Sequence, residues 1–117
     1  TDLNTWKEGH ILVLKIYEVT KKFPKNEQFG LTSQIERAVI SITSNIAEGF
    51  SRYYFKDKVR FYYMARGSVS EVQNQLLIAK DLNYLEVDLF NEIFDQSKKT
   101  QALINGLINS TAKQNIK

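Results

Sequence analysis

The segment TSQIERAVISITSNIAEG, residues 32–49, decides the fold of this 117-residue chain. Its apolar residues follow one another at i, i+4, i+7 and i+11, which is the spacing of one buried helix face. They are Ile35, Val39, Ile42 and Ile46. Ser33 and Glu36 have capping-box spacing at the start, and Gly49 suits the left-handed position after the last turn. We therefore predict a helix over residues 32–48.

Three further helices are predicted by the same criterion, over residues 3–22, 55–82 and 86–109. The apolar face of the first is formed by Trp6, Val13, Tyr17 and Thr20. The face of the third is formed by Ala65, Val69, Val72, Leu76 and Ala79. The fourth has two adjacent stripes, one of Leu89, Ile93, Leu103 and Leu107 and one of Phe90, Phe94, Ile104 and Ile108.

The breaks between these segments are short. Pro24 ends the first helix because a residue before proline is pushed out of the α region, and Asn83 suits a left-handed position closing the third. The polar tail, residues 110–117, is expected to fray. Short connections make neighbouring long helices antiparallel, so the sequence predicts an all-α, antiparallel up-down-up-down four-helix bundle. The length fits one domain, residues 1–117.

The composition is that of an ordinary soluble protein, with 43% apolar and 25% charged residues. The longest early apolar run, residues 11–14, is too short for a signal-peptide core or a membrane span. Cysteine is absent, which excludes disulfides and cysteine-ligated metals and agrees with a reducing compartment. We expect a cytoplasmic protein that does not enter a membrane.

The sequence lacks the residues of most common catalytic and metal sites, and only a carboxylate pair of Glu48 and Glu71 is formally possible. The only histidine is His10, and Lys7 stands where a Glu-x-x-His di-iron motif needs its glutamate. The five glycines are too far apart for a phosphate-binding loop. We interpret Asn45, Glu48 and Gln75 as a polar network inside the bundle that fixes the helix register. The prediction is a protein without catalytic residues, metal or cofactor.

Some apolar residues do not fit an isolated bundle. Phe61, Tyr62 and Tyr63 are consecutive, and neighbours on a helix differ by about 100°, so all three cannot face one core. Ile40 and Ala47 form a side stripe on the second helix. These five residues predict an oligomer interface. The alternative is an asymmetric bundle in which Tyr62 or Tyr63 lies half-buried with its hydroxyl in water.

The positive charge is concentrated in one segment. The net charge is +3, yet residues 52–66 alone carry +4 and the rest of the chain carries −1. The cations are Arg52, Lys56, Lys58, Arg60 and Arg66. They alternate with aromatic residues from Tyr53 to Tyr63, and cations with aromatic faces suit phosphates and unpaired bases. This predicts binding of RNA or DNA; the alternative is a protein-interaction scaffold or accessory subunit whose charge is incidental.

Two stretches resemble the bacterial 23S rRNA-intervening-sequence proteins. They are FGLTSQ, residues 29–34, and SITSNIAEG, residues 41–49, followed by Ala65, Gly67, Ser68 and Glu71. The resemblance extends from Trp6 to about Ile108. It implies a small four-helix bundle that assembles into a five-membered ring. It also implies kinship with the accessory protein of diversity-generating retroelements, a basic pentamer that binds nucleic acid and partners a reverse transcriptase.

The chain departs from that family pattern at three positions. Thr43 stands where the family often has proline, so the second helix is expected to be straighter. Asn83 replaces a usual glycine, which a left-handed cap tolerates. Gly9 replaces an alanine and is expected to weaken the first helix by about 1 kcal/mol.

Overall fold

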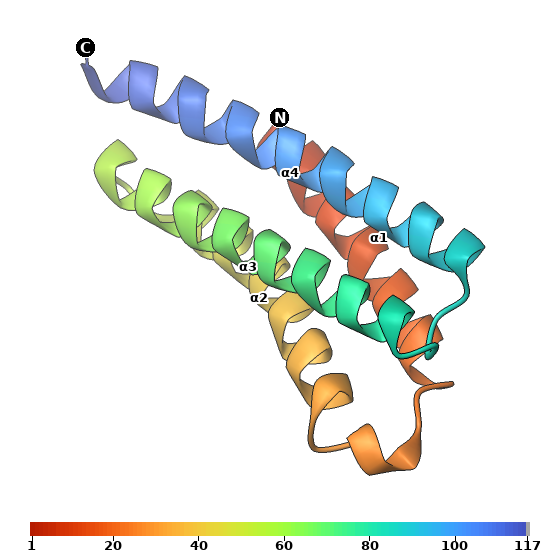
Figure 1. Ribbon diagram of the computed structural model, residues 1–117. Helices are drawn as coiled ribbons and strands as arrows, with labels where there is room; N and C mark the ends of the chain where they lie inside the picture. Colours follow the sequence, from red (N-terminus) through yellow and green to blue (C-terminus); the bar gives the residue numbers. More distant parts are fainter. Residues whose placement is uncertain (117) are drawn as a thin grey trace.

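The described part of the chain forms four α-helices and one short 3₁₀ helix, seen in Figure 1. The structure is a computed structural model that describes the backbone of residues 1–116 and the side chains of residues 1–114. The helices are α1 (Asp2–Thr20), η1 (Lys25–Glu27), α2 (Leu31–Ser51), α3 (Phe55–Asp81) and α4 (Val87–Ile116). Within the described residues there is no strand, and none of the helices is long and apolar enough to cross a membrane. The prediction of an all-α fold with four helices is confirmed.

Contacts between side chains establish that neighbouring helices are antiparallel. Along α2 from Ser41 to Gly49, the contacting residues on α3 run backwards from Ser68 to Tyr62. The same reversal holds for the pairs Gly9–Thr43 and Thr20–Glu36 (α1 with α2), Arg66–Asn105 and Gln73–Ser97 (α3 with α4), and Glu8–Gln96 and Lys15–Glu92 (α1 with α4). The four helices therefore close into an up-down-up-down bundle, as predicted.

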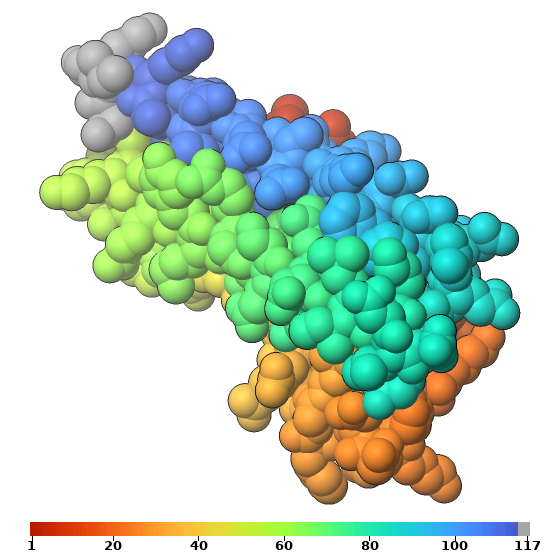
Figure 2. Space-filling view, viewed as in Figure 1, coloured from red at the N-terminus to blue at the C-terminus, as the bar shows by residue number. Residues whose placement is uncertain are grey.

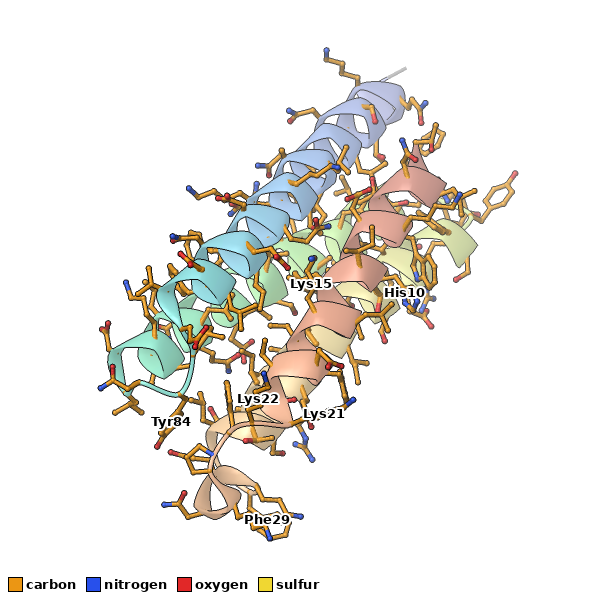
Figure 3. All side chains as sticks on the ribbon, turned by 90° about the vertical axis from the view of Figure 1, so that its right-hand side faces the viewer. His10, Lys15, Lys21, Lys22, Phe29 and Tyr84 are labelled. Carbon is orange, nitrogen blue, oxygen red and sulfur yellow. The ribbon has the colours of Figure 1, made fainter. Side chains whose placement is uncertain are left out.

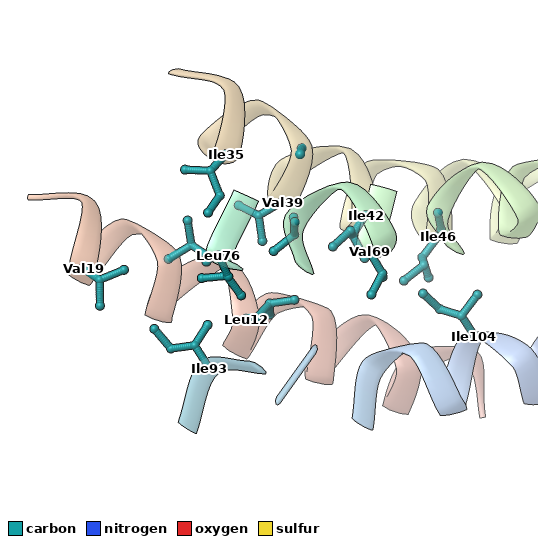
Figure 4. Close-up of a cluster of buried hydrophobic side chains, with 14 of the residues drawn as sticks. Leu12, Val19, Ile35, Val39, Ile42, Ile46, Val69, Leu76, Ile93 and Ile104 are labelled. Atoms are coloured by element: carbon teal, nitrogen blue, oxygen red, sulfur yellow. The ribbon is translucent and has the colours of Figure 1, made fainter. Parts of the chain in front are cut away.

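The core lies where the apolar spacing of α2 and α3 places it. All nine residues predicted to form the buried faces of these two helices are buried. Figure 4 shows Ile35, Val39, Ile42 and Ile46 of α2 above Leu12 of α1. Fully burying one such side chain contributes about 1.5–3 kcal/mol, so this interior is the main source of stability.

The predicted face of α1 is wrong by about one residue. Of the four predicted residues only Thr20 is buried, whereas Trp6 and Val13 are partly buried and Tyr17 is exposed. Leu12 and Ile16, which were not predicted, are fully buried. The prediction placed the aromatic residues of α1 toward the core. In the structure, however, a different face of α1 packs against α2, and the two helices approach each other closely at a glycine.

That glycine is Gly9, which is buried against α2. A Cβ there would lie 3.1 Å from Thr43 Cγ2, closer than ordinary van der Waals contact. Gly9 and Thr43 are two of the three departures from the family pattern, and the structure brings them into contact. The low helix propensity of Gly9 thus accompanies close packing between α1 and α2.

The predicted ends of α2 are also wrong. Helix α2 begins at Leu31, two residues before Ser33, so Ser33 and Glu36 do not form the predicted capping box. Instead Glu27, from the preceding turn, accepts a hydrogen bond from the Leu31 backbone N–H at 3.1 Å. Gly49 lies inside α2, without a positive φ, because the helix continues to Ser51. The glycine is required for packing instead, since a Cβ would overlap the Tyr62 ring.

At the C-terminal end of α3 the prediction holds, and at that of α4 it fails. Asn83 has a φ of 63°, the left-handed conformation expected after α3. The described part of the tail predicted to fray instead continues α4 to Ile116, and Lys117 lies outside the described residues. Thr111 is buried one turn after buried Ile108. The buried face of α4 therefore extends beyond the last isoleucine of the predicted stripe.

The predicted polar network does not form. Asn45 donates to Ser41 on its own helix, and Glu48 is exposed and pairs with Arg52. Gln75 is buried, but its Oε1 has no hydrogen-bond partner among the described residues. The helices are instead linked by shorter side chains, such as the hydrogen bond from Ser68 to Ser41 at 2.9 Å.

Candidate nucleic-acid interface

The basic segment, residues 52–66, begins at the connection between α2 and α3 and continues into α3. We name residues 52–57 the α2–α3 corner; they comprise the short connection and the first turn of α3. In Figure 2 the yellow-green surface of this part of the chain projects at one end of the molecule, away from the orange segment between α1 and α2. The molecule measures 50 × 25 × 18 Å, so the two ends are well separated.

Two of the five predicted cations bind other parts of the chain. Lys58 Nζ donates hydrogen bonds to the carbonyl oxygens of Gly49 and Phe50, at 3.1 and 3.0 Å, and so caps the end of α2. Arg66 Nη1 donates to Asn105 Oδ1 at 3.2 Å, and its guanidinium lies 4.8 Å from the centroid of the Tyr63 ring. These two side chains hold the fold together and are poorly placed to hold phosphates.

Arg52 and Arg60 are exposed and share one aromatic ring. Their guanidinium carbons lie 4.7 and 5.2 Å from the centroid of Phe61. Arg52 also pairs with Glu48 at 3.0 Å, in an arrangement where both side chains are about half exposed. Such exposed ion pairs contribute about 0–1 kcal/mol, so a phosphate can compete for Arg52.

Lys56 has the fewest interactions of the five cations with the described part of its own chain. Among the described side chains it has no ion pair and no hydrogen bond. It lines an open hollow of about 610 Å³ at the corner, together with Tyr53, Tyr54, Phe55 and Asp57. The hollow therefore combines one available cation, one carboxylate and three aromatic side chains.

The aromatic residues of the segment divide into exposed and covered ones. Tyr53 and Tyr54 are 86% and 67% exposed, with ring centroids 5.0 Å apart and planes at 85°. Tyr62 is only 1% exposed, packs edge-on against Phe50 and lies over Gly49. Burial, with a smaller effect of the Asp2 charge, raises the pKa of Tyr62 to about 12.

The position of Tyr62 corrects the predicted oligomer interface. Tyr62 belongs to the core of its own chain, because α3 turns it toward Gly49, where the absence of a side chain leaves room for the ring. Tyr63 is exposed and Phe61 is partly buried under the two arginines. Ile40, 43% exposed, and Ala47 remain on the surface of α2. Four of the five predicted interface residues thus remain wholly or partly accessible.

The described residues hold no group of three or more metal-ligating side chains, counting histidine, cysteine, aspartate and glutamate. His10 is exposed and stacks on Trp6, with ring centroids 4.8 Å apart. The sequence prediction assigned contacts to five named cations and gave stacking to the aromatic residues of the segment without singling out Tyr53 and Tyr54. Their position in a connection of three residues between two long helices was the signal that both rings would face solvent.

Comparison with known proteins gives one family and one fold. Residues 1–106 match the model of a family described as 23S rRNA-intervening sequence protein. The chain is also similar to the crystal structure of a protein with unknown function from the S23 ribosomal protein family of Bacteroides thetaiotaomicron VPI-5482. The two are 23% identical with a TM-score of 0.81, over 89% of this chain and 97% of the other, which shows a shared fold. No curated protein matches the chain.

Proposed function

The chain belongs to the 23S rRNA-intervening sequence protein family, and we propose that it is a non-catalytic, oligomeric protein that binds nucleic acid, as RNA or a ribonucleoprotein. The single observation that carries this proposal is the α2–α3 corner, where exposed Tyr53 and Tyr54 lie beside Lys56, a cation without an ion pair among the described side chains. Cations neutralise phosphates and aromatic faces stack on bases, so this surface has both groups that a nucleic acid needs.

The contacts favour three of the five predicted cations as candidates for phosphate binding. Lys56 and Arg60 are exposed and carry no ion pair within the described chain, and Arg52 has only a weak one. Three phosphate contacts per chain give modest affinity. Several corners on one assembly would raise it through multivalency, because the second contact becomes intramolecular.

Assembly is the second part of the proposal. Exposed Ile40, Ala47 and Tyr63 supply apolar surface that a neighbouring copy would cover, and the family resemblance favours a ring of five. Light scattering coupled to size exclusion should give a mass several times 13.6 kDa. Ile40→Glu should lower that mass while the helical circular dichroism signal stays unchanged. A wild-type monomer at micromolar concentration would contradict the assembly.

Fluorescence anisotropy with a labelled 20-nucleotide RNA, at low and near-physiological salt, tests the binding. The logarithm of the affinity should fall against the logarithm of salt concentration by about 0.7 per single-strand phosphate contact. Lys56→Glu with Arg60→Glu should abolish binding and leave the helical signal and assembly mass intact. Lys58 is left unchanged because it caps α2.

The matched control makes the same charge change at the other end of the bundle. Lys22→Glu with Lys25→Glu replaces two exposed cations near the end of α1, and it should reduce affinity much less. Equal loss in both double variants would mean that net charge, and no particular surface, attracts the RNA.

A protein-interaction scaffold is the second candidate function. It is favoured by Phe29, which is 90% exposed at the tip of the α1–α2 connection and points away from the helices in Figure 3. A wild-type protein that binds no RNA even at low salt would favour this scaffold.

A further inference from the structure

We infer that the hollow at the α2–α3 corner binds one unpaired nucleobase, stacked on Tyr53 or Tyr54, with an adjoining phosphate held by Lys56. The inference rests on the proposed nucleic-acid binding and specifies its ligand as a single strand. Four observations carry it: the aromatic faces that remain free, the angle between the two tyrosine rings, the charges that line the hollow, and its size.

Three of the six aromatic rings of the basic segment are covered by a cation or buried. Phe61 lies under Arg52 and Arg60, Tyr63 lies under Arg66, and Tyr62 is buried. In the described chain no cation stacks on Tyr53 or Tyr54, and both rings are largely exposed. Phe55, which also lines the hollow, is less exposed, at 39%, so stacking by a ligand is directed first to Tyr53 and Tyr54.

The geometry of the pair limits how many bases can stack. Because the ring planes meet at 85° with centroids 5.0 Å apart, the rings touch edge to face and leave no slot between parallel faces. A base can stack on the outer face of one ring while the other ring borders it. The hollow of about 610 Å³ lies within the usual size range of small-ligand sites, roughly 300–1,000 Å³.

The charges that line the hollow separate base from phosphate. Asp57 contributes a carboxylate, which repels a phosphate from its side of the hollow, whereas Lys56 attracts one. The neutral, flat base then occupies the aromatic part and its phosphate lies toward Lys56. A base exposes a whole face only when it is unstacked, so single strands are preferred over duplexes.

The test measures affinity for a labelled single strand and for a duplex of the same length and sequence. The wild type should bind the single strand more tightly. Tyr53→Ala with Tyr54→Ala should weaken single-strand binding by about five-fold or more, because five-fold is the lower end of the loss measured for one stacked base. The salt dependence should keep its slope because no cation is removed. Duplex affinity should stay unchanged.

Two matched variants separate stacking from other roles. Tyr53→Phe with Tyr54→Phe keeps both π-faces and should bind like the wild type. Phe29→Ala removes an exposed aromatic side chain at the opposite end and should also bind like the wild type. All replaced side chains are exposed, so the helical signal should be unchanged throughout.

Each contrary result has a distinct meaning. Equal affinity for single strand and duplex, unaffected by the alanine pair, would overturn the base site while leaving nucleic-acid binding in place. A smaller assembly mass in the alanine pair would overturn it too, since the hollow would then be a contact with a second copy. No binding of either nucleic acid by the wild type would overturn the proposed function and this inference together.

Discussion

The two ends of the bundle are built in opposite ways. At one end, the connection between α1 and α2 is joined to the turn between α3 and α4; we call this the tied end. Tyr84 donates a hydrogen bond to Glu27 Oε2 at 2.9 Å, and its ring packs on Phe23 with centroids 5.7 Å apart. Glu27 also caps α2 through Leu31. The polar groups there satisfy one another.

At the other end, the α2–α3 corner is held mainly by apolar packing. The Tyr62 ring fills the space over Gly49, and Lys58 caps the last carbonyl groups of α2. Beyond these contacts, Tyr53, Tyr54 and Lys56 are left exposed. Tyr84 and Glu27 thus stabilise the chain at the tied end, whereas the exposed aromatic and charged side chains of the corner are available to a ligand. Both ends nevertheless connect antiparallel helices.

The largest effect is expected from removing the contact that holds the corner. Tyr62→Ala should lower the free energy of unfolding by about 3–5 kcal/mol, the usual cost of deleting a buried aromatic side chain. Denaturant titration followed by circular dichroism measures it. Tyr53→Ala is the matched control and should change stability by less than about 0.5 kcal/mol, since this ring is exposed. Equal effects would show that the two tyrosines are not distinguished by burial.

The same buried ring predicts a response to alkaline pH. Burial raises the pKa of Tyr62 to about 12, above the value of about 10 in an unfolded chain. The folded state therefore keeps the proton longer, and this contribution is complete below pH 10 and lost as pH rises toward 12.

Replacement of this hydroxyl tests that response. Tyr62→Phe should lose less stability than the wild type between pH 8 and pH 11, measured by denaturant titration at each pH. Tyr53→Phe, at an exposed tyrosine, should follow the wild type. If the Tyr62→Phe protein loses as much as the wild type, the Tyr62 hydroxyl ionises freely in the folded state.

A smaller loss is expected when the polar link at the tied end is broken. Glu27→Ala removes the acceptor for both Leu31 N–H and the Tyr84 hydroxyl and should cost about 1–2 kcal/mol. Tyr84→Phe removes one of these hydrogen bonds and should cost less. Thermal unfolding measures both variants. A larger cost for Tyr84→Phe than for Glu27→Ala would mean that the cap on α2 contributes nothing.

Apolar spacing in the sequence was sufficient for the fold and for most of the core. Ile42 and Leu76 are buried as their periodicity predicts, because a face repeated over several turns has only one way to avoid water. The face of α1 was mispredicted because its closest contact uses Gly9, a residue without hydrophobic character. The role of Gly49 was also mispredicted, because glycine is favoured both by close packing and by helix termination and the sequence does not distinguish the two.

The site was less predictable than the fold. The sequence locates five cations in one segment, but it does not show that Lys58 turns back to cap α2 or that Arg66 reaches Asn105 on α4. Nor does it separate exposed Tyr53 from buried Tyr62, since both occur in runs of aromatic residues. Such distinctions depend on contacts between distant residues, which local spacing does not encode.

The smallest effect on stability separates two lysines only two positions apart. Lys58→Ala should cost about 0.5–1.5 kcal/mol, because the carbonyl groups of Gly49 and Phe50 lose a charged donor near the negative end of the α2 dipole. Lys56→Ala should cost nothing measurable, because its side chain is exposed and has no ion pair in the described part of the chain, yet it should weaken RNA binding more than Lys58→Ala does. Denaturant titration and RNA anisotropy on the same two proteins give both quantities. If Lys58→Ala instead weakens RNA binding more and leaves stability intact, then Lys58 exchanges its carbonyl partners for phosphate, and the separation of holding and binding cations at this corner is wrong.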